Sequence, residues 1–176
     1  MKIGIFGGTF NPVHLGHTAL PSYICNLGLA DEVWLMVSPQ NPFKRDLKLV
    51  SEETRFRLAD LALRDFPRLR ASNFEFHLPR PSYTCVTLCE LARAYPDDTF
   101  SLIVGADNWQ QFPSWRGSRE ILARFPVIVY PRGGAYLPDT VDVSPYSPVF
   151  LSHAPLYPVS STDIRNAIAA GRDVTS

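Results

Sequence analysis

The sequence predicts an α/β fold: a single domain with a central, mostly parallel sheet and helices on both faces of that sheet. Three observations lead to this prediction. Short and almost unbroken apolar runs recur along the chain, as is typical of strands buried on both faces of a parallel sheet. Amphipathic helical patterns lie between these runs. No internal repeat, low-complexity segment or change in composition marks a second domain, so residues 1–176 are expected to form one unit.

The apolar runs place the strands. Each run is rich in valine, isoleucine, leucine or aromatic residues and is short enough for a buried strand. The predicted strands cover residues 3–6, 33–37, 100–104, 127–130 and 149–151.

Start and stop signals frame the helices between them. Ser51 is typical of an N-cap residue, with Glu52 and Glu53 in the first turn that follows it. Ser118 is expected to cap residues 120–125 in the same way. The other predicted helices are residues 14–27, with a kink or broken turn at Pro21, residues 84–95, and a last helix that opens at Ser160 or Ser161 and closes at Gly171.

Composition limits the classes of partner. The chain has 45% hydrophobic and 12% aromatic residues, which suits one domain with a real core. Its 17 basic and 17 acidic residues give zero net charge, so we expect no nucleic-acid partner and no attraction to an anionic membrane. No apolar run approaches the roughly 20 residues that span a bilayer, and no leader pattern opens the chain. We therefore expect a cytoplasmic protein, and leave open whether it forms a homo-oligomer.

The three cysteines, Cys25, Cys85 and Cys89, are an odd number and contain no C-x-x-C pair. Cys85 and Cys89 stand four residues apart on a predicted helix, so they can share a face. No histidine or third thiol lies near them in the sequence. We therefore expect buried, reduced thiols and no metal site.

Residues 7–17, with the sequence GGTFNPVHLGH, predict a phosphate-binding turn after the first strand. Gly7 and Gly8 allow the backbone to approach a ligand closely, and the helix start after the turn supplies a positive partial charge. His14 and His17 are expected on one face of the first helical turn. The spacing is neither G-x-G-x-x-G nor a Walker A loop. Taken singly, these features also fit a plain turn, capping histidines, or a zinc site that would need a third protein ligand.

Residues 159–165, with the sequence VSSTDIR, predict a second anion site. Hydroxyl and N–H groups gather at a helix start, and Arg165 lies one turn inside the helix. Ordinary helix capping with a solvated arginine is the alternative. Two such sites, each at a strand-to-helix junction and at opposite ends of the chain, favour a ligand that carries phosphate groups.

Together the two motifs resemble the nucleotidyltransferase superfamily, whose Rossmann-like members carry HxGH early and S-[ST]-T-x-[IV]-R late. Within it the chain is most similar to the bacterial nicotinate-nucleotide adenylyltransferase family, over essentially its whole length. The stretches SPQNPFK, RPSYT, GAD and FPSW also match, in order. The resemblance implies that nicotinate mononucleotide attacks the α-phosphate of ATP, giving deamido-NAD and pyrophosphate in NAD biosynthesis. It also implies Mg²⁺ held mainly by the ATP phosphates, with no protein ligand to the metal.

The resemblance further implies the site residues. Those expected to be catalytic are His14, His17 and Arg165. Those expected to bind ATP are Gly7, Gly8, Thr9, Phe10, Gly105, Asp107, Ser161, Thr162 and Arg165. Those expected to bind the mononucleotide are Asn11, Lys44, Thr84, Trp115 and Arg132. Trp115 would stack on the pyridine ring, and ordinary core packing is its alternative role.

The chain departs from the family pattern at two places. Relatives usually continue beyond the last predicted helix with a further helix, whereas this chain ends at Ser176, so a C-terminal helix is expected to be missing. Gly134 stands where relatives often have proline. Two other functions stay open: a pantetheine-phosphate adenylyltransferase, whose acceptor has no aromatic ring for Trp115, and a non-catalytic nucleotide-binding module.

Overall fold

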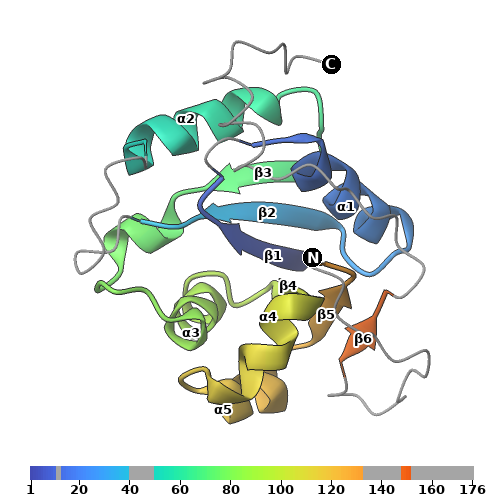
Figure 1. Ribbon diagram of the computed structural model, residues 1–176, viewed down its shortest axis with the longest axis vertical. Helices are drawn as coiled ribbons and strands as arrows, with labels where there is room; N and C mark the ends of the chain where they lie inside the picture. Colours follow the sequence, from blue (N-terminus) through green and yellow to red (C-terminus); the bar gives the residue numbers. More distant parts are fainter. Residues whose placement is uncertain (11–12, 40–49, 133–147, 152–176) are drawn as a thin grey trace.

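The computed structural model describes residues 1–10, 13–39, 50–132 and 148–151, and within them the chain forms one six-stranded sheet (Figure 1). The strand order is β3-β2-β1-β4-β5-β6, and each of these pairings is parallel. The strands are β1 (Lys2–Gly8), β2 (Glu32–Val37), β3 (Leu69–Ser72), β4 (Thr99–Gly105), β5 (Val127–Tyr130) and β6 (Val149–Phe150). The predicted α/β fold is confirmed.

Helices cover both faces of the sheet, as predicted (Figure 1). The helices α1 and α2 contribute to the core on one face, and α3, α4 and α5 contribute to the core on the other. The helical segments are α1 (Leu15–Asn26), α2 (Glu52–Ala62), α3 (Thr84–Ala94), α4 (Ala106–Gln111) and α5 (Ser118–Arg124), with short 3₁₀ turns η1 (Phe74–His77) and η2 (Phe112–Ser114). Among the described residues, no helix is both long enough and apolar enough to cross a bilayer.

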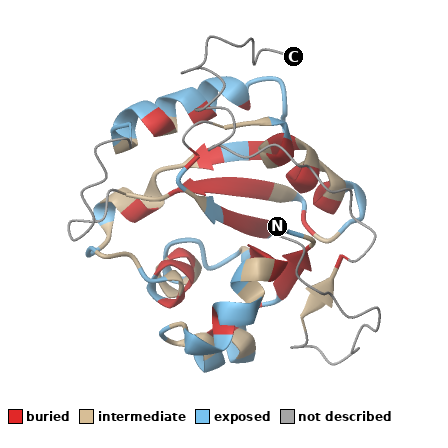
Figure 2. Cartoon of the chain, in the orientation of Figure 1, coloured by how far each residue is buried: buried red, intermediate tan, exposed pale blue. Residues whose placement is uncertain are grey.

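Strand β2 shows how one sheet supports two cores. Successive side chains of a strand point to opposite faces. Val33, Leu35 and Val37 therefore pack with α1 and α2, while Trp34 and Met36 pack with α3. All five are buried, and Figure 2 shows the strands as the most buried part of the chain. Burying each of these side chains contributes about 1.5–3 kcal/mol, which explains why β2 reads as an unbroken apolar run.

The order of the strands reverses at β1. From β1 the chain builds β2 and β3 on one side and then crosses to place β4 on the other side. In open parallel sheets, ligands bind outside the carboxyl ends of the strands at such a reversal. The ends of β1 and β4 are therefore where a ligand site is expected.

The predicted strands agree with the structure within two residues at each end, and residues 127–130 coincide with β5. The edge strand β3 was not predicted. Only Leu69 and Ala71 of its four residues are buried, and Arg70 between them is exposed, so this segment carries no apolar run.

The start of α2 confirms the predicted N-cap, because the Ser51 hydroxyl accepts the Thr54 N–H at 3.3 Å. The helix predicted over residues 84–95 is α3, which ends one residue earlier, at Ala94. Of the two outcomes predicted at Pro21, a broken turn is wrong, because α1 continues through that residue with buried side chains on both sides of it, and a kink stays a prediction. The last predicted helix, from Ser160 or Ser161 to Gly171, lies outside the described residues.

The predicted cap at Ser118 is wrong by one residue. Gly117 is the N-cap of α5, with φ of 72° and no side chain that caps the helix. The physical reason is a close approach. A Cβ at this position would lie 2.6 Å from the Sγ atom of Cys85, and the positive φ also favours glycine.

Candidate active site

His14 and His17 stand together at the start of α1, just beyond the end of β1. Nδ1 of His14 accepts the N–H of Gly16 at 3.1 Å, and Nδ1 of His17 accepts the N–H of His14 at 3.0 Å. The two rings are stacked, with centroids 3.6 Å apart. The shared face predicted from their spacing is thus present, and the histidines also cap the helix, through N–H groups rather than carbonyls.

These contacts define which nitrogen can donate. Because Nδ1 of each ring accepts a backbone N–H, the neutral ring carries its proton on Nε2. Each histidine can therefore offer one N–H donor to a ligand without carrying a positive charge. Such a donor can stabilise a phosphate oxygen as charge develops on it.

His17 is held in the neutral form by its surroundings. Its pKa is lowered to about 3, mainly by burial and in smaller part by the nearby charges of His14 and Arg132. Aromatic rings supply the apolar environment. Phe10 packs edge-on at 4.8 Å between centroids and Phe6 at 6.0 Å. Protonating this imidazole at neutral pH would place a charge in an apolar site, so it acts as a neutral group.

Phe10 adopts a backbone conformation that is rare for a residue with a side chain, with φ of 49°. Such a conformation costs on the order of 1–3 kcal/mol. Its ring is only 3% exposed and packs against Phe6 and His17, which offsets that cost. The side chain belongs to the core, so a contact with ATP at this position would use the backbone.

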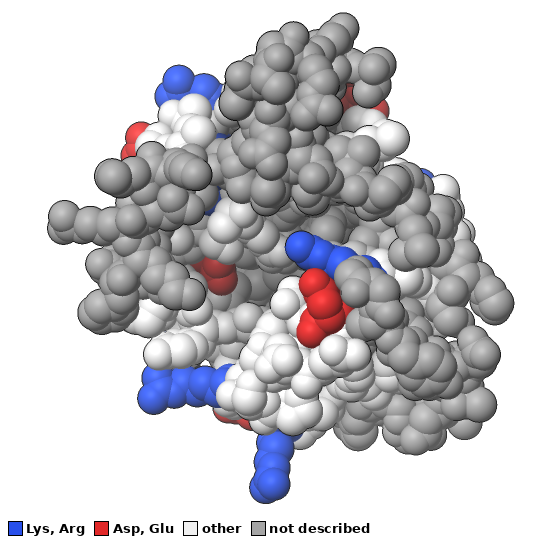
Figure 3. Space-filling model, in the orientation of Figure 1, with Lys and Arg blue, Asp and Glu red and all other residues white. Residues whose placement is uncertain are grey.

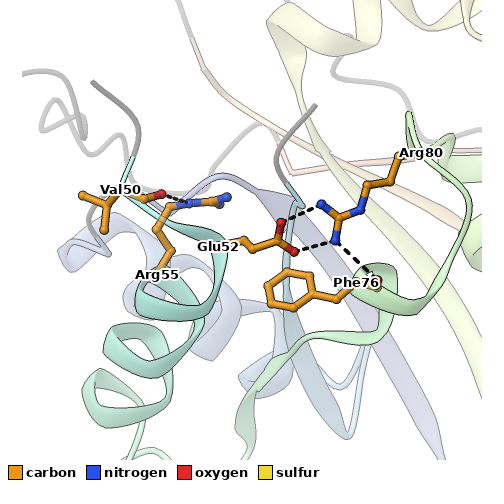
Figure 4. A network of polar contacts seen from close by, with 5 residues as sticks. All are labelled: Val50, Glu52, Arg55, Phe76 and Arg80. Carbon is orange, nitrogen blue, oxygen red and sulfur yellow. Dashed lines mark hydrogen bonds and ion pairs between the residues drawn. The ribbon is translucent and has the colours of Figure 1, made fainter. Parts of the chain in front are cut away.

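Arg55, on α2, forms a hydrogen bond with the backbone that follows the first strand. The sequence motifs did not predict a role for this residue. Arg55 is only 1% exposed, and its Nη1 donates to the carbonyl of Thr9 at 2.8 Å. Its Nε donates to the carbonyl of Val50 at 2.9 Å (Figure 4). Next to it, Glu52 forms a two-pronged ion pair with Arg80, at 2.6 Å for both contacts. Arg55 therefore anchors the backbone that leads into the histidine pair.

Gly7 and Gly8 are the last two residues of β1 and pair with the end of β2, whereas the sequence predicted a turn here. The Gly8 carbonyl accepts the N–H of Ser38 at 2.9 Å. Both glycines thus belong to the end of the strand, and the predicted contact between their N–H groups and phosphate stays a prediction. A Cβ on Gly7 would meet no described atom within 4 Å, so the strand end presents open backbone there.

The carboxyl ends of β4 and β5 add charged groups beside β1. The Arg132 guanidinium lies 3.5 Å from Oδ2 of Asp107 and donates to the Tyr130 hydroxyl at 3.4 Å. Gly105 lies directly beneath them, because a Cβ there would be 2.8 Å from both Cδ of Arg132 and Oδ1 of Asp107. The charge of Arg132 also lowers the pKa of His17. Arg132 and His17 are therefore close enough to belong to one site.

Thr84 and Trp115 lie on the α3 side of the sheet. Thr84 is the first residue of α3, where the first-turn N–H groups of a helix lack helical partners. Trp115 follows η2, is half-buried, and lies 5.2 Å from the Phe112 ring between centroids. Gly117, two residues on, packs against Cys85, so this turn and the start of α3 are neighbours. Both the stacking role of Trp115 and a packing role are compatible with a half-buried ring.

The charged side chains of the described residues are scattered over the face seen in Figure 3, where a basic and an acidic group lie side by side near the centre. The described residues contain one group of potential metal ligands, Cys85, Cys89 and Glu120, which does not involve the histidines.

Comparison with known proteins identifies the family. The cytidylyltransferase-like family model matches residues 5–167. A probable nicotinate-nucleotide adenylyltransferase from Bacteroides fragilis is 48% identical, over 98% of this chain and 85% of its own length. The chain belongs to the nicotinate-nucleotide adenylyltransferase family. A probable nicotinate-nucleotide adenylyltransferase from Bacteroides thetaiotaomicron is 46% identical, over 99% of this chain and 85% of its own.

Solved structures of this family share the fold. A putative nicotinate-nucleotide adenylyltransferase from Vibrio parahaemolyticus is 26% identical, with a TM-score of 0.69 over 99% of this chain and 84% of its own. A nicotinic acid mononucleotide adenylyltransferase from Plasmodium falciparum, complexed with NaAD, is 20% identical, with a TM-score of 0.76 over 98% of this chain and 86% of its own. The second likeness concerns the fold alone.

The family's expected site residues divide into three sets, of which Thr84 and Trp115, on the α3 side of the sheet, form the smallest. The described ones that gather at the ends of β1, β4 and β5 are Gly7, Gly8, Thr9, Phe10, His14, His17, Gly105, Asp107 and Arg132. Those that lie outside the described residues are Asn11, Lys44, Ser161, Thr162 and Arg165. The roles of all three sets stay predictions. Arg55 and Tyr130 also contact site residues, and the motifs did not indicate either of them.

Proposed function

We propose that the chain transfers the adenylyl group of ATP directly to nicotinate mononucleotide, giving deamido-NAD and pyrophosphate as a step of NAD biosynthesis. The observation that carries this proposal is the pair of histidines whose Nδ1 atoms are both occupied, next to Arg132 at the reversal of the sheet. Relatives that are 46% and 48% identical over nearly the whole chain are named for this activity.

The reaction needs alignment more than proton transfer. An oxygen of the mononucleotide's 5′-phosphate forms a bond to the α-phosphorus of ATP. The bond from that phosphorus to the bridging oxygen breaks, and pyrophosphate leaves with the electron pair. The attacking phosphate is already ionised near neutral pH, because its second pKa is about 6. The protein therefore has to bring two anions into line and stabilise the charge between them.

The histidines and the second motif would act on the ATP phosphates. Nε2–H of His14 and of His17 would donate to phosphate oxygens, and the low pKa of His17 makes it a neutral donor rather than an acid. Arg165, with Ser161 and Thr162 at the start of its predicted helix, would hold the departing pyrophosphate.

The remaining predicted residues would bind the two substrates at separate places in the site. Gly105 and Asp107 would line the adenosine side, and the open backbone at the end of β1 would admit the phosphates. Lys44, Arg132 and Asn11 would hold the phosphate of the mononucleotide. Thr84 would offer backbone N–H groups to the pyridine carboxylate, and Trp115 would stack on the ring.

Mg²⁺ belongs to this proposal as part of the substrate. ATP would enter as its Mg²⁺ complex, with the ion held by phosphate oxygens. The one carboxylate among the described predicted site residues, Asp107, lies beside Arg132, which suits an ion pair better than a metal ligand.

A pyrophosphate-release assay with several acceptors tests the proposal. We expect turnover with ATP and nicotinate mononucleotide, slower turnover with nicotinamide mononucleotide, and none with phosphopantetheine or without an acceptor. Turnover only with phosphopantetheine would assign the chain to the other acceptor. ATP binding without pyrophosphate release from any acceptor would identify a non-catalytic nucleotide-binding module.

A further inference from the structure

Three side chains that can bind metals meet where α3 packs against α5. Cys85 and Cys89 stand one turn apart on α3, and Glu120 lies in the first turn of α5. Sγ of Cys85 is 3.2 Å from Oε2 of Glu120, and Sγ of Cys89 is 3.6 Å from Oε1. All three ligand atoms lie within 4.8 Å of one another, and both thiols are free. The sequence could not indicate Glu120 as the third member, because it lies far along the chain.

We propose that Cys85, Cys89 and Glu120 form a binding site for a thiophilic divalent cation, with Zn²⁺ as the representative ion. In a tetrahedral zinc site, with Zn–S near 2.3 Å and Zn–O near 2.1 Å, a sulfur and an oxygen ligand stand about 3.6 Å apart. The sulfur–oxygen distances in the structure, 3.2 Å and 3.6 Å, are near this value but involve the two different oxygens of Glu120, so the carboxylate must turn for one oxygen to serve as the ligand. The ion can therefore be bound through small side-chain rotations, with water as the fourth ligand.

Arg124 supplies the charge that such a site needs. Its Nη1 lies 3.2 Å from Sγ of Cys89 and 3.5 Å from Oε1 of Glu120. Two thiolates and a carboxylate around a divalent cation carry one net negative charge, which this guanidinium balances. Outer partners of this kind also orient the ligands and raise metal affinity.

The site adjoins the α3 end that the proposed function uses, but it does not depend on that function. Gly117 packs directly against Cys85, and Thr84 precedes Cys85 in the chain. A bound ion would clamp α3 to the start of α5 and stiffen the contact between them. Without an ion, the thiols act as donors to the carboxylate, which is the ordinary polar contact that the experiment must distinguish from a metal site.

The test is a titration of the metal-free chain, residues 1–176, with Cd²⁺, in phosphine reductant and without ATP. Cadmium–thiolate charge-transfer absorbance in the ultraviolet reports sulfur ligation, and competition with a chelator reports affinity. We expect one equivalent of Cd²⁺ to produce this band. Cys89→Ser should lower the affinity by at least about 100-fold, and Arg124→Gln by about 10–100-fold. Cys25→Ser, at a buried thiol outside the site, should leave affinity unchanged.

A second readout uses stability. Zn²⁺ at a hundredfold excess over its Kd should raise the Tm of the wild-type chain by about 5–10 °C and leave Cys89→Ser unaffected. Because Cys89 and Glu120 are more exposed than Cys85, Cys89→Ser and Glu120→Gln are the variants expected to fold normally. The proposal is overturned if the folded wild-type chain shows no thiolate band. It is equally overturned if Cys89→Ser and Glu120→Gln bind with wild-type affinity, or if Cys25→Ser loses the band.

Discussion

Adding a single methyl group at Gly105 should lower activity far more than stability. A Cβ there would lie 2.8 Å from Cδ of Arg132, 3.1 Å from its Cβ and 2.8 Å from Oδ1 of Asp107. Comfortable carbon–carbon contacts are about 3.5–4.0 Å, so the Arg132 side chain must move by most of an ångström. The backbone itself accepts alanine, because Gly105 has φ of −75°.

The two consequences differ in size. The ion pair between Arg132 and Asp107 joins side chains that are 55% and 42% exposed, so disturbing it costs at most about 1 kcal/mol. For a chain of this size, that lowers the Tm by about 2–4 °C. Misplacing a substrate-positioning group by about 1 Å can cost about 10²-fold in rate. Gly105→Ala should therefore lower kcat/KM for the mononucleotide by about 10–10²-fold.

Pyrophosphate-release kinetics and thermal unfolding of Gly105→Ala, Arg132→Ala and the double variant check this reasoning. Because the methyl group is expected to act by displacing Arg132, the double variant should be no slower than Arg132→Ala alone. If the losses of kcat/KM in the two single variants multiply in the double variant, the methyl group does not act by displacing Arg132. Wild-type kinetics, or a Tm loss well beyond 4 °C, in Gly105→Ala would also refute the mechanism.

Three further predictions follow from single side chains. Trp115→Ala should weaken nicotinate mononucleotide binding by about 5- to 150-fold, the equivalent of about 1–3 kcal/mol of stacking, with the KM for ATP and the Tm unchanged. A large Tm loss with an unchanged KM for the mononucleotide would show a packing role instead. As pH falls from 6.5 towards 3, the unfolded chain takes up a proton that the buried His17 ring does not, so urea unfolding should show a loss of stability of up to about 1.4 kcal/mol per pH unit. That loss should be smaller in His17→Asn, and equal slopes in the two chains would contradict the burial of the ring. Arg55→Ala should lower the free energy of unfolding by about 2–5 kcal/mol, because it leaves the carbonyls of Thr9 and Val50 unpaired. Arg80→Ala, at an exposed residue, should lower it by about 1 kcal/mol or less, and similar losses in both variants would argue against the anchoring role.

Sequence patterns predicted the elements in which the buried positions are occupied by apolar residues. The strand at residues 127–130 reads as an apolar run because both of its faces are covered. The edge strand β3 does not, since Arg70 interrupts it at an exposed position. The start of α5 depended on a tertiary contact, the approach of Gly117 to Cys85, which no local pattern records.

The sequence motifs predicted the histidines of the candidate site. They did not predict the hydrogen bonds that hold the histidine rings, or the role of Arg55. The spacing of His14 and His17 indicated a shared face, whereas the use of both Nδ1 atoms in capping emerged only from the three-dimensional contacts. Arg55 lies in a charged stretch that reads as solvent-facing. Its position four residues before the buried Ala59 is the one signal that places it on the inner side of α2.

The most direct test of the central claim, that neutral His17 donates from Nε2 to a phosphate of ATP, is the kcat of His17→Asn in pyrophosphate release. Asparagine keeps an acceptor near the Nδ1 position, so the bond from the His14 N–H can be retained while the Nε2 donor is removed. We expect kcat to fall by about 10²–10³-fold, with the mononucleotide KM and the Tm close to those of the wild type. Wild-type turnover in a folded His17→Asn chain would contradict the claim.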